Sequence, residues 1–202
     1  MPTSGKYLSA DTRRALTVQT VLALAASGNP SEITTAAIAA DMSVTQGSLF
    51  RHFENKAAIW QSVMEWVTTE LMPRIEQAID QNPTPLTALR AIFSSHLEFV
   101  EQWPGVPRIL FGELQRTEST PAKSAVQMLL KQYAERVQGL LKKGVACGDL
   151  HSSTDTKAAS VLFVGTIQGL VMQSMLAGDI NQLRRKGQPV FDIYQRGIEA
   201  HT

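Results

Sequence analysis

Proline and glycine residues divide this chain into blocks in which apolar side chains recur at the spacing of an α-helix. The block from Lys56 to Asp80 shows the pattern most clearly, because Ile59, Val63 and Val67 begin a series that repeats every four residues. The strict alternation of apolar and polar residues that marks a half-buried strand is absent from the sequence. These features predict an all-α fold.

Capping residues and helix breakers predict where the helices begin and end. Thr84 is a suitable N-cap, Pro85 fits the first helical position, and Gly28 and Gly178 are suited to follow helix ends. We expect about nine helices, over residues 12–27, 34–41, 45–51, 56–80, 85–103, 107–113, 121–147, 153–178 and 189–200.

Composition restricts the class of protein but does not identify a partner. Hydrophobic residues make up 44% of the 202 residues and charged residues 18%, which is typical of a globular protein. The formal net charge is only +1, so bulk charge does not indicate nucleic-acid binding. Any such prediction must depend on local residues.

The most informative segment, Ile33 to Lys56, has the pattern of two short helices joined by a tight turn. Ile38, Leu49 and Phe53 supply apolar contacts between them, and the second helix then exposes small polar residues. A helix that enters the major groove needs a slim face with hydrogen-bonding groups. Gly47 costs about 1 kcal/mol in a helix relative to alanine, and close approach of the backbone to DNA would explain it.

This segment resembles the DNA-binding head of the TetR family of regulators. The matching positions are Ile38-Ala39, Val44-Thr45, Gly47, Leu49-Phe50, His52-Phe53, Lys56 and Ile59. Ser43 departs from the family pattern, which usually has glycine or asparagine there, and Phe50 replaces a tyrosine whose hydroxyl would meet a phosphate. The resemblance covers about residues 14–60, and the remainder is similar only in its helical layout.

The resemblance implies a regulator whose head reads double-stranded operator DNA as part of a homodimer. It also implies that the remaining helices bind a small-molecule effector and that the last two form the dimer interface. We therefore expect a three-helix, helix-turn-helix head at residues 1–55 and a helical ligand-binding and dimerisation domain at 56–202. The expected function is a repressor released from its operator by the effector, with activation left open.

The predicted DNA-binding residues lie at the starts of the two short helices and directly after the second. They are Thr34, Thr35, Thr45, Gln46, Gly47, Ser48, Phe50, Arg51, His52 and Lys56. Arg51 and Lys56 are expected to contact phosphates, and Gln46 is expected to pair with an adenine edge.

Dimer and effector residues are predicted from apolar helices in the second half of the chain. The spacing of Gly165 and Gly169 lets two backbones approach, either between subunits or within one chain. The predicted interface comprises Leu162, Gly165, Gly169 and Met172. The predicted effector-binding residues are Phe93, His96, Trp103, Phe111, Tyr133 and Phe163, with plain core packing as the alternative for each. Glu113, a charge in an apolar segment, either meets a cationic ligand or faces water.

No pattern in the sequence supports catalysis. The four histidines lie far apart, and neither a zinc-binding helix motif nor a phosphate-binding glycine loop is present. We expect no enzyme activity, catalytic residue, metal site or cofactor. The single cysteine, the lack of an apolar leader and the lack of an apolar span of about 20 residues favour a cytoplasmic protein without a membrane segment.

Two other classes of protein remain compatible with these patterns. One is an all-α binding or scaffold protein whose helix-turn-helix is incidental, and the other is an enzyme built on a helical bundle. Salt-dependent binding to a short palindromic duplex would separate the regulator from both.

Overall fold

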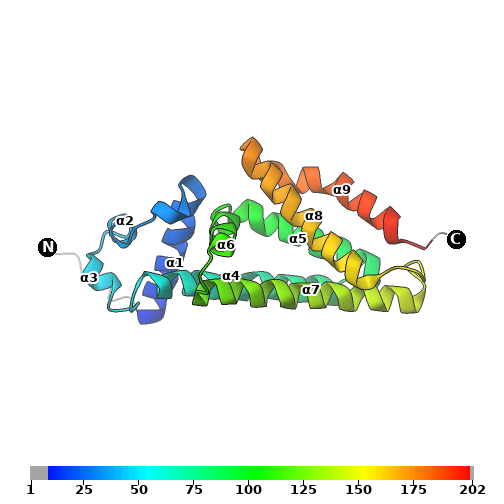
Figure 1. Ribbon diagram of the computed structural model, residues 1–202, viewed down its shortest axis with the longest axis horizontal. Coiled ribbons are helices and arrows are strands. Elements are labelled where there is room, and N and C mark those ends of the chain that lie inside the picture. Colours follow the sequence, from blue (N-terminus) through cyan, green and yellow to red (C-terminus); the bar gives the residue numbers. More distant parts are fainter. Residues whose placement is uncertain (1–8, 201–202) are drawn as a thin grey trace. The chain divides into compact units, whose positions relative to one another are not determined.

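The computed structural model describes residues 9–200, and within that range it contains α-helices and two short 3-10 helices but no strand (Figure 1). The all-α prediction is confirmed. In chain order the elements are α1 (Ala10–Ser27), η1 (Pro30–Glu32), α2 (Thr35–Asp41), α3 (Gln46–Leu49), α4 (Lys56–Asp80), α5 (Pro85–Gln102), α6 (Gly105–Gln115), α7 (Pro121–Cys147), α8 (Thr156–Ala177), η2 (Ile180–Gln182) and α9 (Leu183–Ile198).

Several helix starts are produced by the local capping groups that the sequence indicates. Thr84 Oγ1 accepts a hydrogen bond from the Thr87 backbone N–H, and Thr87 Oγ1 accepts one from the Thr84 backbone N–H, which forms a capping box ahead of Pro85. Asp155 accepts from the N–H groups at the start of α8. These caps satisfy backbone donors that the helix itself leaves without acceptors.

The chain forms two compact units. Of the described residues, the first unit contains 9–66 together with Gly105–Val126, and the second contains Val67–Pro104 together with 127–200. Helices α4 and α7 each continue from one unit into the other. The predicted division into functional domains at residues 1–55 and 56–202 stays a prediction.

The first unit is organised around α1. Its buried side chains Val18, Val21 and Leu22 form an apolar face, and α1 packs on both α2 and α6. Gly105 begins α6 and is buried against α1. A Cβ atom at this position would lie 2.1 Å from the Leu22 carbonyl oxygen, so only glycine allows the two backbones to approach this closely.

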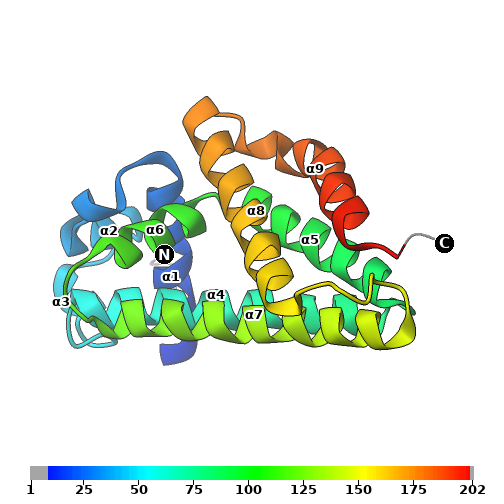
Figure 2. The ribbon, with the colours of Figure 1, turned by 45° about the vertical axis from the view of Figure 1, so that its right-hand side comes forward.

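The second unit is built from α5, α8 and α9, which lie side by side in both ribbon views (Figures 1 and 2). Aromatic rings fill the space between them. The Phe93 ring centroid lies 5.7 Å from that of Phe163 and 5.2 Å from that of Phe191, and Phe163 lies 5.5 Å from Tyr194. Such edge-on and tilted ring contacts add to the stabilisation from burying the rings.

The prediction that the last helix starts at Pro189 is wrong. Helix α9 begins at Leu183, and Pro189 lies inside it. The Glu101 carboxylate of α5 accepts a hydrogen bond from the Arg184 backbone N–H at 2.9 Å and a second from the Arg184 side chain at 2.6 Å. This cap and the burial of Leu183 and Gly187 outweigh the cost of about 3 kcal/mol for proline inside a helix.

Helix α8 is long and apolar enough to cross a membrane by length and composition alone. Only 33% of its most apolar window is buried within the chain, so much of its apolar surface faces outward. One such helix is weak evidence for a membrane protein, because a helix that packs against a second protein surface meets the same criteria.

The contact between α1 and α6 gives the first prediction. We expect Gly105→Ala to lower the free energy of unfolding by about 1–3 kcal/mol, because its methyl group would overlap the α1 backbone. Gly112→Ala, in the same helix, is the matched control, since a Cβ there meets no atom within 4 Å. Urea denaturation of both variants measures the effect, and equal stability of the two would contradict the assigned contact.

Candidate nucleic-acid interface and effector site

Two threonine side chains within the helix-turn-helix cap the starts of its two short helices. Thr34 Oγ1 accepts a hydrogen bond from the Ala37 N–H at 3.1 Å, and Thr45 Oγ1 accepts one from the Ser48 N–H at 3.2 Å. Each cap starts one of the two short helices, α2 and α3. Both threonines therefore have a structural role in addition to any contact with DNA.

The turn between α2 and α3 has the left-handed conformation that the family pattern leads us to expect. Ser43 has a φ of 54°, and it is the non-glycine residue with positive φ in the described part of the chain. Such a conformation costs a non-glycine residue about 1–2 kcal/mol. Two backbone hydrogen bonds hold the turn, from Ser43 N–H to Ala40 O at 3.0 Å and from Val44 N–H to Ala39 O at 2.9 Å.

Helix α3 is shorter than predicted, because it ends at Leu49 and not at Arg51. Leu49 and Phe53 are buried, as are Ile38 and Ala39 of α2, and these contacts hold the short helix in place. Phe50, Arg51 and His52 lie in the turn that follows α3, where Phe50 and Arg51 are exposed and His52 is half-buried. Apolar contacts therefore orient α3 while its outer face stays accessible.

The outer face of α3 presents Gln46 and Gly47 to solvent. Gln46 Nε2 donates a hydrogen bond to Thr35 Oγ1 at 3.1 Å, which joins two predicted DNA-binding residues across the turn. A Cβ atom on Gly47 would meet nothing closer than Thr45 Oγ1 at 3.9 Å. No contact among the described residues requires glycine at this position.

Lys56 lies in a different setting from the other predicted DNA-binding residues. It is half-buried at the start of α4, and its Nζ is 5.5 Å from the centroid of the Trp60 ring. Burial and the nearby Arg116 lower the pKa of Lys56 below its ordinary value, while Glu113 opposes this shift. The sequence pattern indicated the charge of Lys56 but not this enclosure.

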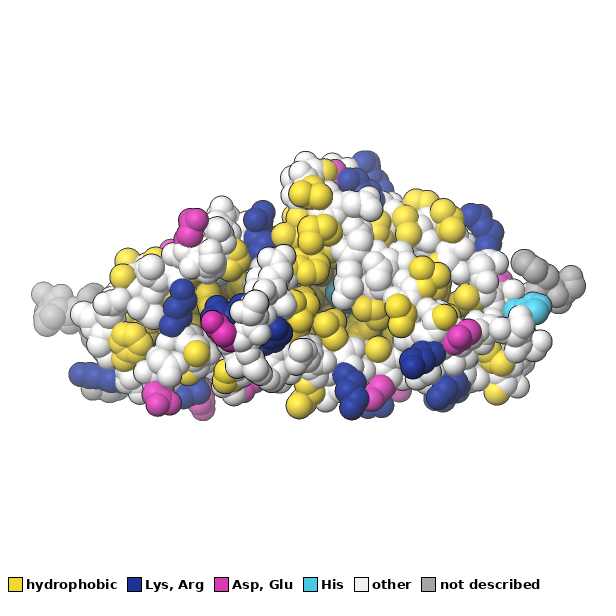
Figure 3. Space-filling model, in the orientation of Figure 1, with side chains coloured by type: hydrophobic (Ala, Val, Ile, Leu, Met, Phe, Trp, Pro, Cys, Tyr) yellow, Lys and Arg dark blue, Asp and Glu magenta, His cyan; other side chains and the backbone are white. Residues whose placement is uncertain are grey.

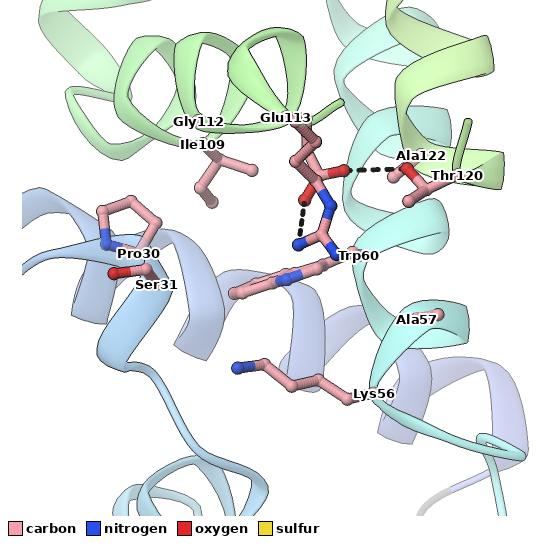
Figure 4. Close-up of a pocket in the computed structure, with 11 residues that line it drawn as sticks. Pro30, Ser31, Lys56, Ala57, Trp60, Ile109, Gly112, Glu113, Thr120 and Ala122 are labelled. Carbon is pink, nitrogen blue, oxygen red and sulfur yellow. Dashed lines mark hydrogen bonds and ion pairs between the residues drawn. The ribbon is translucent and has the colours of Figure 1, made fainter. Parts of the chain in front are cut away.

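Lys56 lines a cavity of about 320 Å³ within the first unit (Figure 4). Residues from η1, α4, α6 and the start of α7 surround it, among them Trp60 and Glu113. Glu113 is 5% exposed, so the expectation that it faces water is wrong. Its carboxylate accepts a hydrogen bond from Thr120 Oγ1 at 2.9 Å.

The structure brings four of the six predicted effector-binding residues together in the second unit. Phe93, Tyr133 and Phe163 are buried, and His96 Nδ1 shares a hydrogen bond of 3.1 Å with the Tyr133 hydroxyl. Trp103 is half-buried at the C-cap of α5, whereas Phe111 belongs to α6 of the first unit. The role of these residues in effector binding stays a prediction.

Burial changes the ionisation of the His96–Tyr133 pair. It lowers the pKa of His96 to about 4 and raises the pKa of Tyr133 above its ordinary value. Both side chains are therefore neutral near pH 7, and the pair supplies hydrogen-bonding groups in a mainly aromatic environment.

The predicted dimer residues lie on the outward face of α8. Leu162 is 58% exposed and Met172 is 37% exposed, and a Cβ atom at Gly165 or Gly169 would meet nothing within 4 Å. Val161 and Leu176 extend the same apolar surface, which is seen along α8 in Figure 3. These glycines therefore do not serve packing against other described residues of the chain.

Comparison with protein families identifies this arrangement. A family model described as bacterial regulatory proteins of the tetR family matches residues 20–63, and one described as the tetracyclin repressor-like C-terminal domain matches residues 110–188. The chain belongs to the TetR family. It is thus a DNA-binding transcription regulator with a helical C-terminal domain, and members of this family bind operator DNA and small molecules and act as dimers.

Curated relatives of this TetR-family protein include nucleoid occlusion factors SlmA. The factor from Idiomarina loihiensis is 28% identical over 131 residues, which cover 65% of this chain and 67% of that protein. The factor from Vibrio vulnificus is 25% identical over 139 residues, which cover 69% of this chain and 71% of that protein.

Solved structures show the same fold at low sequence identity. The ketosteroid regulator KstR2 of Mycobacterium tuberculosis superposes with a TM-score of 0.79 at 22% identity, covering 99% of this chain and 100% of that one. The regulator FadR from Bacillus subtilis, solved with stearoyl-CoA, has a TM-score of 0.79 at 20% identity, covering 92% of this chain and 99% of that one. These neighbours are transcriptional regulators and not enzymes.

The lowered pKa of half-buried His96 gives a prediction of pH-dependent stability. Because its pKa is lower in the folded chain than in the unfolded chain, His96 contributes stability that is complete above about pH 6.5 and declines as the pH falls toward 4. The wild type should lose part of its free energy of unfolding between pH 7 and pH 4.5. We expect this loss to be smaller in His96→Gln by roughly 1–3 kcal/mol. Urea denaturation at both pH values measures this difference.

The matched control is the exposed histidine His151. His151→Gln should keep the wild-type pH dependence. Identical pH dependence of the wild type and His96→Gln would show that His96 is not the group responsible.

Proposed function

We propose that this protein is a repressor that leaves its operator when a small molecule binds. The observation that carries the DNA-binding part is the exposed, slim face of α3, held in place by Leu49, Phe53 and the Thr45 cap. A helix presented in this way can enter the major groove with its N-terminal residues toward the base edges.

The proposed DNA contacts divide into positioning and reading groups. Arg51, which is exposed after α3, and Lys56 would meet phosphates, with Thr34 and Thr35 adding contacts at the start of α2. Gln46 would read a base through its amide, and its hydrogen bond to Thr35 supports this by limiting the side chain to few orientations. Thr45, Gly47, Ser48, Phe50 and His52 complete the proposed interface.

The outward face of α8 supports a homodimer. Leu162, Met172 and Leu176 are apolar side chains that the described chain leaves exposed, and Gly165 and Gly169 allow a second helix to approach between them. A second copy would cover this surface, which also explains its apolar character without a membrane. The proposed location is therefore the cytoplasm.

The aromatic cluster of the second unit supports effector binding. His96 and Tyr133 supply two neutral polar groups beside Phe93 and Phe163, which is the composition of many small-molecule sites. In the proposed mechanism the effector favours a different arrangement of α4, the helix that starts at the DNA-binding residue Lys56 and ends at Asp80 in the second unit. Operator affinity then falls by the difference in effector affinity between the two arrangements.

A second candidate function is nucleoid occlusion, the role in the name of the SlmA relatives. Both functions require DNA binding, so the proposed head serves either one. Mapping of bound sites along the chromosome separates them. A local repressor should occupy few promoters, whereas a factor that acts on the nucleoid as a whole should occupy sites spread along the chromosome.

Gly47 provides the most direct test of the DNA-binding face. Gly47→Ala should leave thermal stability unchanged or slightly higher, because the added methyl group would come no closer to a described atom than 3.9 Å, at Thr45 Oγ1. The same methyl group should lower affinity for the DNA upstream of the protein's own gene by about 1–3 kcal/mol, or roughly 5- to 150-fold. Fluorescence anisotropy with a labelled duplex measures the change.

Gly139→Ala is the control for the glycine-to-alanine change, since Gly139 is an exposed helical glycine of α7 with the same open surroundings. It should bind the duplex as the wild type does. Unchanged affinity in Gly47→Ala would remove the argument that α3 lies close to DNA.

Gly169 tests the proposed dimer. Gly169→Leu should be tolerated within one chain but should shift sedimentation at micromolar concentration toward the monomer, because the larger side chain blocks the second helix. Gly139→Leu is the matched control and should sediment as the wild type. A wild-type protein that is itself monomeric and fully helical would contradict the proposal at once.

A further inference from the structure

The cavity beside α4 has features of a binding site that the proposed function does not use. The residues that line it all belong to the first unit, whereas the aromatic cluster that is proposed to bind the effector belongs to the second. Its volume of about 320 Å³ is within the range of small-molecule sites. Trp60 and Ile109 supply large apolar surfaces, and Lys56, Glu113 and Arg116 bring charges to the same space.

The negative charge in this cavity is already compensated. Glu113 accepts the hydrogen bond from Thr120 Oγ1 at 2.9 Å, and its carboxylate lies 4.0 Å from the Arg116 guanidinium. Arg116 is also paired with Glu118 at 3.2 Å. A cationic ligand would have to compete with these partners for Glu113.

The positive charge of Lys56 is not compensated in this way. Among the described residues its ammonium group has no hydrogen-bond or ion-pair partner, and it lies over the Trp60 ring at 5.5 Å. Figure 4 shows the amine pointing into the space between Trp60 and the Pro30–Ser31 segment. Burial and Arg116 lower the pKa of Lys56, so a nearby negative charge would be favourable.

The start of α4 strengthens this preference. Lys56 and Ala57 are the first residues of a helix that runs to Asp80, and both line the cavity. The N-terminal end of a helix carries a partial positive charge and favours anions. Lys56 and the start of α4 therefore both favour an anion in the cavity.

We infer that this cavity binds a small organic anion, whose carboxylate meets Lys56 and whose flat apolar body lies against Trp60 and Ile109. The ligand class is thus an aromatic or alicyclic carboxylate. The site is separate from the effector site proposed in the second unit, and its own binding reaction does not depend on DNA.

The inference has a consequence for regulation that rests on the proposed function. Lys56 is assigned to a DNA phosphate, and the same ammonium group would hold the carboxylate. The anion and the operator would then compete for one lysine, so each should weaken the binding of the other by the same factor.

The test compares three probes that share one ring system and differ in charge. We expect isothermal titration calorimetry to show that 2-naphthoate binds the wild-type protein at least tenfold more tightly than neutral 2-naphthamide, as a hydrogen bond between charged groups predicts. Tighter binding of 2-naphthylmethylamine would overturn the inference and assign recognition to Glu113. Equal binding of the anion and the amide would also overturn it.

Two variants locate the site. Lys56→Met should reduce the affinity for 2-naphthoate to that for the amide, whereas Lys131→Met, at an exposed lysine of the second unit, should not. Gly112→Leu should weaken the binding of both 2-naphthoate and 2-naphthamide, because its side chain would fill part of the cavity from a position with free space. Gly139→Leu is the control for this change. Wild-type affinity for 2-naphthoate in both Lys56→Met and Gly112→Leu would place the ligand elsewhere.

The Gly47→Ala variant separates this inference from the proposed function. It should bind 2-naphthoate as the wild type does even if it no longer binds operator DNA. If the wild type binds 2-naphthoate but no DNA, the anion site stands and the proposed function fails. If it binds DNA but not 2-naphthoate, the anion site fails alone.

Discussion

The proposed DNA interface depends on how a four-residue helix is held. Helix α3 is far too short to be stable alone. Forming the first turn of a helix restricts several residues for a single hydrogen bond, and only further turns offset this loss of conformational entropy. This helix is instead stabilised by the buried side chains of Leu49 and Phe53, by the Thr45 cap and by the left-handed turn at Ser43. Leu49 and Phe53 are buried on the inner side of α3, so the exposed side that carries Gln46 and Gly47 remains available for a partner.

The same residues therefore have roles in folding and in recognition. Thr34 and Thr45 cap helices with the side chains that the sequence assigned to DNA, and Gln46 is oriented by Thr35. Replacing an N-cap residue by alanine lowers the stability of the protein by about 1 kcal/mol. Loss of DNA binding in such variants would therefore not by itself reveal a contact with DNA. Gly47 has no such second role, because no described atom requires the absence of its side chain.

Polar groups that lie among large apolar side chains mark both candidate ligand sites, but in different ways. The His96–Tyr133 pair is neutral and its two members satisfy each other in an aromatic environment. Around Trp60, charges are only partly matched, since Glu113 has partners among the described residues and Lys56 has none. An uncompensated charge in a confined space is costly, which is why the second site favours a ligand of opposite charge.

The sequence alone determined the all-α class, most helix boundaries and the helix-turn-helix, because caps, prolines and apolar spacing act over a few neighbouring residues. Pro85 and Pro121 begin helices as predicted for this reason. Only the tertiary structure decided that α9 starts at Leu183, where Glu101 of α5 provides the cap, and that Glu113 is buried. The partner in each case comes from another segment of the chain, and no local pattern records which segments fold together.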